Sequence, residues 1–251
     1  MVVTTHRDAS PASDPHEALR AKSARVVAQL RDEYGSGEPQ GGDPTDGLVH
    51  TILSQHTADR NSGAAFRALK ERYTSAHDLA RADVGELAQT IRSAGLANIK
   101  AARIKETLLT LEARYGTADL SFLKDLPMEE GEEILRSLPG VGPKTAACVL
   151  LFSCKQPALP VDTHVHRVAR RLGLIGPRTS AEKAHDELAR LVSPADVYDF
   201  HVGLIRHGRR VCQAQHPRCG QCVLQAQCDY FHMATGRADV EDPGAADGSR
   251  L

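Results

Sequence analysis

Hydrophobic positions recur at helical spacing along most of the chain. In the clearest run, between residues 101 and 115, apolar side chains return every three or four positions, as on one face of an α-helix. Its members are Ala101, Ile104, Leu108, Leu111 and Tyr115. Weaker runs of the same kind predict helices at about 15–34, 48–53, 59–73, 147–151, 163–172, 181–192 and 195–208. No segment alternates with a sustained period of two, so the pattern predicts an all-α fold.

Polar residues that can begin a helix stand before several of these runs. Asp59, Ser75 and Asp83 are each placed where a side-chain oxygen can accept a hydrogen bond from the first turn. Between residues 35 and 46 the chain contains four glycines and two prolines, which predicts a loop and a candidate seam between domains. At the two ends, residues 1–15 and 232–251, we expect disordered tails.

The composition is that of a globular protein. Its 251 residues are 41% hydrophobic and 25% charged, which allows one large core or two smaller ones. No apolar run is long enough to cross a membrane, and the N-terminus lacks the pattern of a secretory signal. We therefore expect a soluble intracellular protein, in which six cysteines argue against a disulfide framework.

Charge is balanced overall but not along the chain. The formal net charge is −1, yet residues 136–211 contain twelve Lys and Arg against six Asp and Glu. A basic central face of this kind can meet a polyanion while the molecule stays near neutral. The alternative is surface charge scattered without function.

The segment Leu138–Ala146 reads LPGVGPKTA and predicts a tight turn followed by a helix. Gly140 and Gly142 can take positive φ and allow close approach to the backbone, and Pro143 suits the first helical position. The free amides of such a turn can hold an anion such as a phosphate. Lys144 follows at once and is a candidate amine nucleophile. Taken alone, the segment also fits an ordinary turn with a solvated lysine.

Four cysteines follow one another within 17 residues near the C-terminus, with the spacing C-x6-C-x2-C-x5-C. They are Cys212, Cys219, Cys222 and Cys228. Thiolates this close repel one another unless a metal neutralises them, so the run predicts either a [4Fe–4S] cluster or a zinc ion, and its spacing does not choose between them. The alternative is four free buried thiols. We interpret Cys148 and Cys154, on or near an apolar helix, as core residues.

A third motif, PVDTHVHRV, covers residues 160–168. Asp162 directly precedes a helical pattern and can cap it. A carboxylate brought beside Lys144 would instead stabilise a developing positive charge or move protons near the amine. His164 and His166 are two residues apart, so they do not share a helix face, and we assign neither to a metal.

These motifs, in this order, resemble the endonuclease III family of DNA glycosylases, which belongs to the helix-hairpin-helix superfamily with a Gly-Pro/Val-Asp loop. The resemblance runs from about residue 17 to 231. It is carried by LPGVGPKTA (138–146), VDTHVHRVARRLGL (161–174) and the cysteine run, and also by GLANIKA (95–101) and LSQHTAD (53–59).

The resemblance implies a two-lobed all-α protein. A six-helix barrel with the hairpin would occupy residues 37–156, and a second lobe, from 16–36 and 157–231, would hold a [4Fe–4S] cluster on the four cysteines. Double-stranded DNA with damaged bases or abasic sites would lie across the cleft, with the damaged base flipped out. The implied protein is a monomer located in the cytoplasm with the nucleoid, as in bacteria.

The implied activity is that of a bifunctional DNA glycosylase and AP lyase, usually acting on oxidised pyrimidines. Lys144 would attack C1′ and form a Schiff base, β-elimination would follow, and Asp162 would assist. Gly140 and Gly142 would hold a DNA phosphate. Gln55 or His56 and Leu96 match positions that fill the gap left by the flipped base, although an ordinary buried leucine is the alternative for Leu96. His164 and Arg218 are further DNA-binding candidates.

Two segments depart from the family pattern. The family commonly reads Ser-Ala-Gln-Ala-Thr-Asp where this chain has Ser-Gln-His-Thr-Ala-Asp at 54–59, which shifts the gap-filling residue by one position. The loop between Cys212 and Cys219 usually offers several basic residues, and here Arg218 alone is surely charged. A weaker grip on DNA with a shallower salt dependence follows.

Other readings of the same motifs are a monofunctional glycosylase, a non-catalytic DNA-binding module, and a paralogue with narrowed activity. The adenine-excising relatives typically lack the lysine and carry a large extra domain. Retention of both Lys144 and Asp162 argues against the non-catalytic module. A small electron-transfer protein would leave the long helical stretch before the cysteines unexplained.

Overall fold

The computed structural model describes residues 15–236, and within them the chain is helical and contains no strand. The first half contains α1 (Pro15–Tyr34), α2 (Pro44–Ser54), α3 (Asp59–Arg72), α4 (Ala76–Arg81), α5 (Val84–Thr90) and α6 (Ala97–Tyr115). The second half contains α7 (Met128–Arg136), α8 (Pro143–Phe152), α9 (Thr163–Leu172), α10 (Ala181–Ala189), α11 (Val197–Arg210) and α12 (Asp229–Thr235). Short 3₁₀ turns lie at Arg92–Ala94, Ser121–Asp125, Pro194–Asp196, Cys219–Gln221 and Gln225–Gln227. The predicted all-α fold is confirmed.

Local sequence explains where several of these helices begin. Ser75 and Asp83 cap α4 and α5, as predicted, by accepting from the amides of Asp78 and Glu86. Asp59 does not cap α3, because it is the first helical residue and its carboxylate pairs with Arg209. Side-chain caps also begin α2, α9 and α10, whereas α3, α6, α7, α8, α11 and α12 begin without one.

The expected tails fall mostly outside the described residues, since 1–14 and 237–251 are not described. Pro15, assigned to the first tail, begins α1 instead. Residues 232–235, assigned to the second tail, belong to α12, which Gly236 ends with φ 67°. None of the helices between Pro15 and Gly236 combines the length and the apolar character needed to cross a lipid bilayer.

Two groups of buried apolar residues form the core. One group draws its members from residues 48–158, and the other from 26–30 and 151–228. The two groups adjoin at α8, because Leu150 packs in the first group and Leu151 in the second. The division into a barrel lobe and a cysteine-bearing lobe stays a prediction, and these two groups are the cores on which it would rest.

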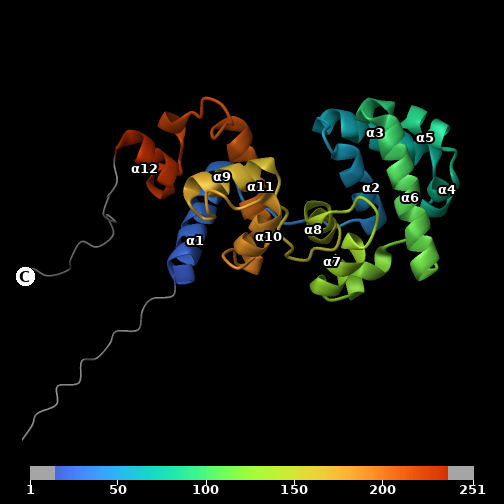
Figure 1. Cartoon of the computed structure of the whole chain (residues 1–251), viewed down its shortest axis with the longest axis horizontal. Helices are drawn as coiled ribbons and strands as arrows, with labels where there is room; N and C mark the ends of the chain where they lie inside the picture. The colour runs from blue at the N-terminus through green and yellow to red at the C-terminus, as the bar shows by residue number, and fades with distance from the viewer. Residues whose placement is uncertain (1–14, 237–251) are drawn as a thin grey trace, which may run out of the picture.

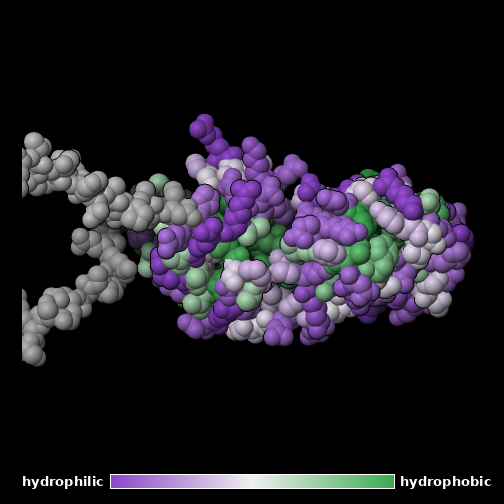
Figure 2. All heavy atoms as spheres, turned by 90° about the horizontal axis from the view of Figure 1, so that it is seen from below, coloured by the Kyte–Doolittle hydropathy of each residue, from purple (hydrophilic) through white to green (hydrophobic). Residues whose placement is uncertain are grey.

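Helix α8 lies at the junction of these two groups. It contacts α2 and α7 on one side and α10 on the other. In Figure 1, α2–α6 gather at one end of the molecule and α1, α9, α11 and α12 at the other, with α8 and α10 between them. From below, polar residues cover most of the face, and apolar residues gather at its middle and over the end formed by α2–α6 (Figure 2). The segment that carries Lys144 therefore sits at the centre of the fold.

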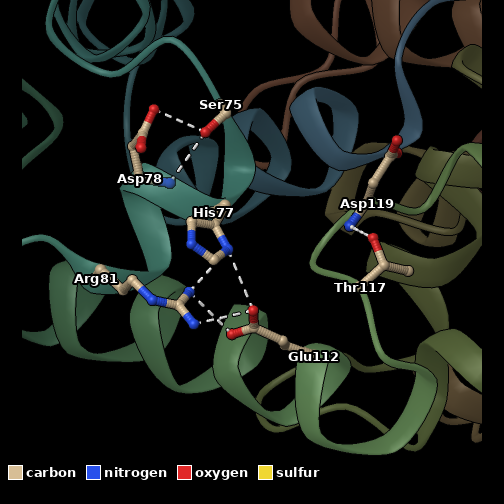
Figure 3. Close-up of polar contacts among 7 residues, drawn as sticks. All are labelled: Ser75, His77, Asp78, Arg81, Glu112, Thr117 and Asp119. Carbon is tan, nitrogen blue, oxygen red and sulfur yellow. Dashed lines mark hydrogen bonds and ion pairs between the residues drawn. The ribbon is translucent and has the colours of Figure 1, made fainter.

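Polar contacts fasten α4 against α6, away from this centre (Figure 3). Arg81 donates to both carboxylate oxygens of Glu112, at 3.0 and 3.1 Å, and His77 Nδ1 lies 3.2 Å from Glu112 Oε1. The hydrogen bond from Arg81 lowers the pKa of Glu112. Nearby, the hydroxyl of Thr117 accepts from the amide of Asp119. These bonds fix the C-terminal half of α6, whose N-terminal half reaches the candidate site.

Candidate functional site at the hairpin and helix α9

The turn between α7 and α8 is open to solvent at its two glycines. Gly140 has φ 72°, in the left-handed region, whereas Gly142 has φ −95° and is extended. Of the two glycines that can take positive φ, Gly140 does so, whereas Gly142 serves as the N-cap of α8 in an extended conformation. Within residues 15–236 the amides of both glycines have no hydrogen-bond partner, while Val141 donates to Leu138 O at 3.2 Å. Two free exposed amides at a helix start are an arrangement typical of anion-binding sites.

Lys144 lies in the first turn of α8 and is half-buried. Cys148 lies one helical turn further on, with only 8% of its surface exposed. Burial raises the pKa of the Cys148 thiol, whereas the charge of Lys144 and a hydrogen bond with it lower that pKa. We interpreted Cys148 as a core residue; it is buried, and it also contacts the candidate nucleophile.

Asp162 is the N-cap of α9, which confirms its structural interpretation. Its Oδ1 accepts from the amides of His164 and Val165, at 2.8 Å each. Both bonds end on one oxygen, so the cap does not need Oδ2. One oxygen that accepts two hydrogen bonds holds the carboxylate at the helix start and leaves Oδ2 available for chemistry.

The charges of Lys144 and Asp162 both act on two buried side chains, those of Cys148 and His201. The charge of Asp162 raises the pKa of both Cys148 and His201, and the charge of Lys144 lowers both. His201 is fully enclosed, and burial is the main cause that lowers its pKa to about 4. Its Nδ1 lies 2.8 Å from Pro160 O. Because a carbonyl oxygen only accepts, Nδ1 carries a proton, and the pKa of about 4 keeps the ring neutral near pH 7.

The two loops with the gap-filling candidates carry strained backbone. His56 and Leu96 have φ 52° and 48°, a region that residues with a Cβ rarely adopt. Both side chains are exposed, Leu96 to 56%. The alternative of a buried Leu96 is therefore wrong. Gln55 is half-buried, and its Oε1 accepts from Arg103 at 2.8 Å.

The remaining DNA-binding candidates are His164 and Arg218. His164 is half-buried, and its Nδ1 lies 3.1 Å from a guanidinium nitrogen of Arg167. Arg218 is exposed beside the second cysteine. Arg209 donates to Asp59, with Nη1 at 2.7 Å from Oδ2, and the charge of Asp162 acts on the same arginine. This ion pair joins α11 to α3.

All four cysteines of the C-terminal run line one small cavity of about 20 Å³. Burial raises the pKa of Cys222 to about 11, and the other three thiols act on it electrostatically. Arg171 donates to Cys212 Sγ at 3.2 Å, the amide of Leu224 donates to Cys222 Sγ at 3.4 Å, and His207 Nε2 lies 3.3 Å from Cys222 Sγ. Within residues 15–236, no three His, Cys, Asp or Glu side chains converge tightly enough for a single metal ion.

Several residues of the site carry no recognisable local signal. His201 and Arg103 lie on ordinary amphipathic helices, and Lys100 looks like a solvated lysine until its burial is known. Their roles depend on partners 40 or more residues away, such as Pro160 for His201 and Gln55 for Arg103. Periodicity places such residues on a helix face and says nothing of what that face meets.

An all-α chain with a glycine hairpin, a capping aspartate and a lysine at one junction defines a helix-hairpin-helix protein. The sequence model described as HhH-GPD superfamily base excision DNA repair protein matches residues 49–194. The chain belongs to this superfamily.

Curated relatives and solved structures agree with this family. The chain is 37% identical to endonuclease III of Thermotoga maritima over 80% of its own length and 89% of the relative's. It is 32% identical to endonuclease III of Sulfolobus acidocaldarius, over 73% and 81% of the two chains. The structure of a non-covalent endonuclease III–DNA complex superposes with a TM-score of 0.73 at 28% identity, over 86% of this chain and 98% of that one.

Proposed function

We propose that this chain is a bifunctional DNA glycosylase and AP lyase of base excision repair, which removes oxidised pyrimidines from duplex DNA as a monomer in the bacterial cytoplasm. The observation that carries the proposal is geometric: Lys144 follows two free glycine amides in the first turn of α8, and Asp162 caps α9 with one carboxylate oxygen only. The charges of both residues act on Cys148 and His201. An amine and a carboxylate at one site are the groups that imine chemistry at a sugar needs. The similarity to endonuclease III structures with bound DNA supports the substrate.

DNA would be held first by its backbone. The free amides of Gly140 and Gly142 would donate hydrogen bonds to a phosphate oxygen beside the lesion, and the adjacent N-terminus of α8 favours negative charge there. His164 and Arg218 would add contacts along the basic stretch. Because the amides of Gly140 and Gly142 lie four and two residues before Lys144, a phosphate held there would bring the sugar to the amine.

The glycosylase step exchanges one bond at C1′ for another. The free amine of Lys144 attacks C1′, the glycosidic bond breaks, and the base leaves with the bonding electrons and takes up a proton. The amine then loses a proton, and the C1′–O4′ bond opens as O4′ is protonated. The product is a Schiff base between Nζ and C1′ with an open sugar.

The lyase step uses the acidity that the Schiff base confers on C2′. Loss of a C2′ proton leaves electrons that form the C2′–C3′ double bond and expel the 3′ phosphate, which cuts the strand on that side. Water then hydrolyses the imine and returns Lys144. Asp162 would stabilise the positive charge at the sugar and accept the proton from the amine, with the oxygen that the cap of α9 does not use.

The buried His201 would add no charge beside Lys144 and Asp162. Its proton stays on Nδ1, bound to Pro160 O, so it adds no positive charge that would compete with Lys144 for Asp162. Leu96, with Gln55 or His56, would occupy the space that the flipped nucleotide leaves in the stack. The exposure of Leu96 and the positive φ of His56 and Leu96 support that role.

We propose that the four cysteines hold an iron–sulfur cluster, as the similarity to endonuclease III implies. They surround one cavity, and two N–H donors and an imidazole nitrogen approach the sulfurs, as suits anionic thiolates. When bound, a [4Fe–4S] cluster on Cys212, Cys219, Cys222 and Cys228 would cross-link these thiolates and supply a one-electron redox centre.

Borohydride trapping tests the proposal. With duplex DNA that contains thymine glycol or an abasic site, hydride reduction of the Schiff base should leave a stable protein–DNA adduct. Lys144→Ala should abolish the adduct, and Lys183→Ala, which removes an exposed lysine of α10, should leave it unchanged. Base release without an adduct would identify a monofunctional glycosylase. Lesion binding without either product would identify a non-catalytic or narrowed paralogue, and equal trapping by Lys144→Ala would exclude this lysine as the nucleophile.

A further inference from the structure

Lys100 is a buried lysine whose three ammonium hydrogens are all used. Its Nζ donates to Leu53 O at 2.7 Å, to Thr57 Oγ1 at 2.7 Å and to Ala94 O at 2.8 Å. Only 2% of the residue is exposed. Thr57 Oγ1 is also hydrogen-bonded to Ala94 O, so the acceptors form one connected group. One side chain of α6 therefore joins the end of α2 to the loop before α6.

The positive charge of Lys100 has no acidic partner. In the described part of the chain no carboxylate lies in ion-pair contact with its Nζ, and burial lowers its pKa. Burying a cation on neutral oxygens is unfavourable unless the geometry requires it. A methionine here would remove the hydrogen bonds of Lys100 to Leu53 O and Ala94 O and leave Ala94 O with the hydroxyl of Thr57 alone, so the ammonium is used for its three directed bonds.

The bonds bracket the two strained loops. Leu53 and Thr57 flank His56, and Ala94 lies two residues before Leu96. His56 and Leu96 are both left-handed, with φ 52° and 48°, and such residues persist only where the surroundings over-determine them. The backbone amide of Lys100 also donates to Leu96 O at 3.0 Å. Lys100 is thus the residue that determines both loops together.

The joined loops present an apolar tip to solvent. Leu96 is 56% exposed and Ile99 57% exposed, one turn apart at the start of α6. Beside them Arg103, one turn after Lys100, donates to Gln55 and packs its side chain against Gly140. One short stretch of α6 therefore contacts the apolar tip, the glutamine and the glycine turn.

We propose that Lys100 is a positioning residue that fastens loops 54–57 and 94–96 into one rigid edge, so that Leu96 enters the base stack together with the Gln55–His56 pair, with Ile99 against the neighbouring step. The inference rests on the proposed function, because it assumes that this edge faces damaged duplex. Lys100 itself does not touch DNA. The rigid edge lets the protein unstack a lesion without first ordering two separate loops.

The test measures insertion without requiring catalysis. The probe is a duplex with a tetrahydrofuran abasic analogue, which cannot form a Schiff base, and with 2-aminopurine opposite it. Wild-type protein should bind this duplex more tightly than undamaged duplex and change the 2-aminopurine fluorescence. Lys100→Met should lower the ratio of the two affinities about tenfold and remove most of the fluorescence change. Its effect on undamaged duplex, which is bound by phosphate contacts, should be smaller.

Lys105→Met is the matched control. Lys105 lies on the same helix and donates to a main-chain oxygen, Ala82 O at 2.7 Å, on the side away from these loops. The control should keep the wild-type ratio. If Lys100→Met does not fold, Thr57→Val decides, because it retains Lys100 and removes the bridging hydroxyl, and it should shift the ratio in the same direction.

The outcomes separate the two proposals. A folded Lys100→Met or Thr57→Val that keeps the wild-type ratio and fluorescence change overturns the role of Lys100 and leaves the proposed function standing. Equal losses in Lys105→Met show a general effect on α6 and also overturn it. A wild-type protein without preference for the tetrahydrofuran duplex refutes the damaged-DNA function itself, and the role of Lys100 with it.

Discussion

Gly140 lies directly against the side chain of Arg103. A Cβ added at position 140 would come within 2.6 Å of Arg103 Cδ and Nε. Arg103 in turn holds Gln55, so the glycine that offers a free amide also sets the position of the arginine that orders a distant loop. The hairpin and the 54–57 loop are therefore mechanically linked through one side chain, although 85 residues separate Gln55 from Gly140 in the sequence.

Gly140→Ala should destabilise the protein by about 1–2 kcal/mol, because an alanine at φ 72° is strained and Arg103 must move. Gly42→Ala is the opposite case, with an ordinary φ and no atom within 4 Å of the added Cβ. It should be neutral or stabilising by about 0.4–1 kcal/mol, since the substitution restricts the unfolded chain. Urea unfolding of both variants decides, and equal stabilities would show that neither φ nor the arginine contact constrains residue 140.

Asp162→Asn should bind lesion DNA and release the base slowly. An asparagine still caps α9, because its side-chain oxygen accepts from the same two amides. It cannot take a proton from the amine or balance charge at the sugar, so the single-turnover rate should fall about 100-fold or more. Asp162→Ala should also lose about 1 kcal/mol of stability with the cap. An unchanged rate in Asp162→Asn would leave Asp162 with the structural role alone.

The purified protein should be yellow-brown and contain about four iron atoms per chain. Cys222→Ser should lose the broad visible absorption, because Cys222 is one of the four thiols around the cavity. Cys154→Ser is the matched control, since burial raises the pKa of this thiol to about 11 as well, and it lies outside the cavity. A colourless protein with stoichiometric zinc would exclude the cluster.

The free energy of unfolding should fall as the pH drops from about 6.5 to about 4. His201 has a pKa of about 4 in the folded protein against 6.5 as a free side chain, so in this window only the unfolded chain binds the proton. One such histidine contributes a slope of up to about 1.4 kcal/mol per pH unit, and below its folded pKa the loss is complete. His201→Gln should flatten this dependence in denaturant titrations across the window. The same slope in the variant would mean that His201 titrates freely.

The sequence alone determined the features that depend on a few neighbouring residues. Helical periodicity, the caps at Ser75 and Asp83, the turn at Gly140 and the grouping of four cysteines all act within one or two turns of the chain. The sequence does not show which of the two glycines takes positive φ, and it predicts a tail where residues 232–235 are helical, since both depend on fine local geometry that composition does not report.

Tertiary structure alone decided which residues meet. The charges of Lys144 and Asp162 both act on His201. Lys100 donates to three buried oxygens, and Arg209 contacts Asp59, which lies 150 residues away in the sequence. These relationships follow from the way in which two cores pack around α8. A lysine on a helix reads the same in sequence whether water or three carbonyl and hydroxyl oxygens surround it. The difference is desolvation, which is a property of the packed whole and not of the local chain.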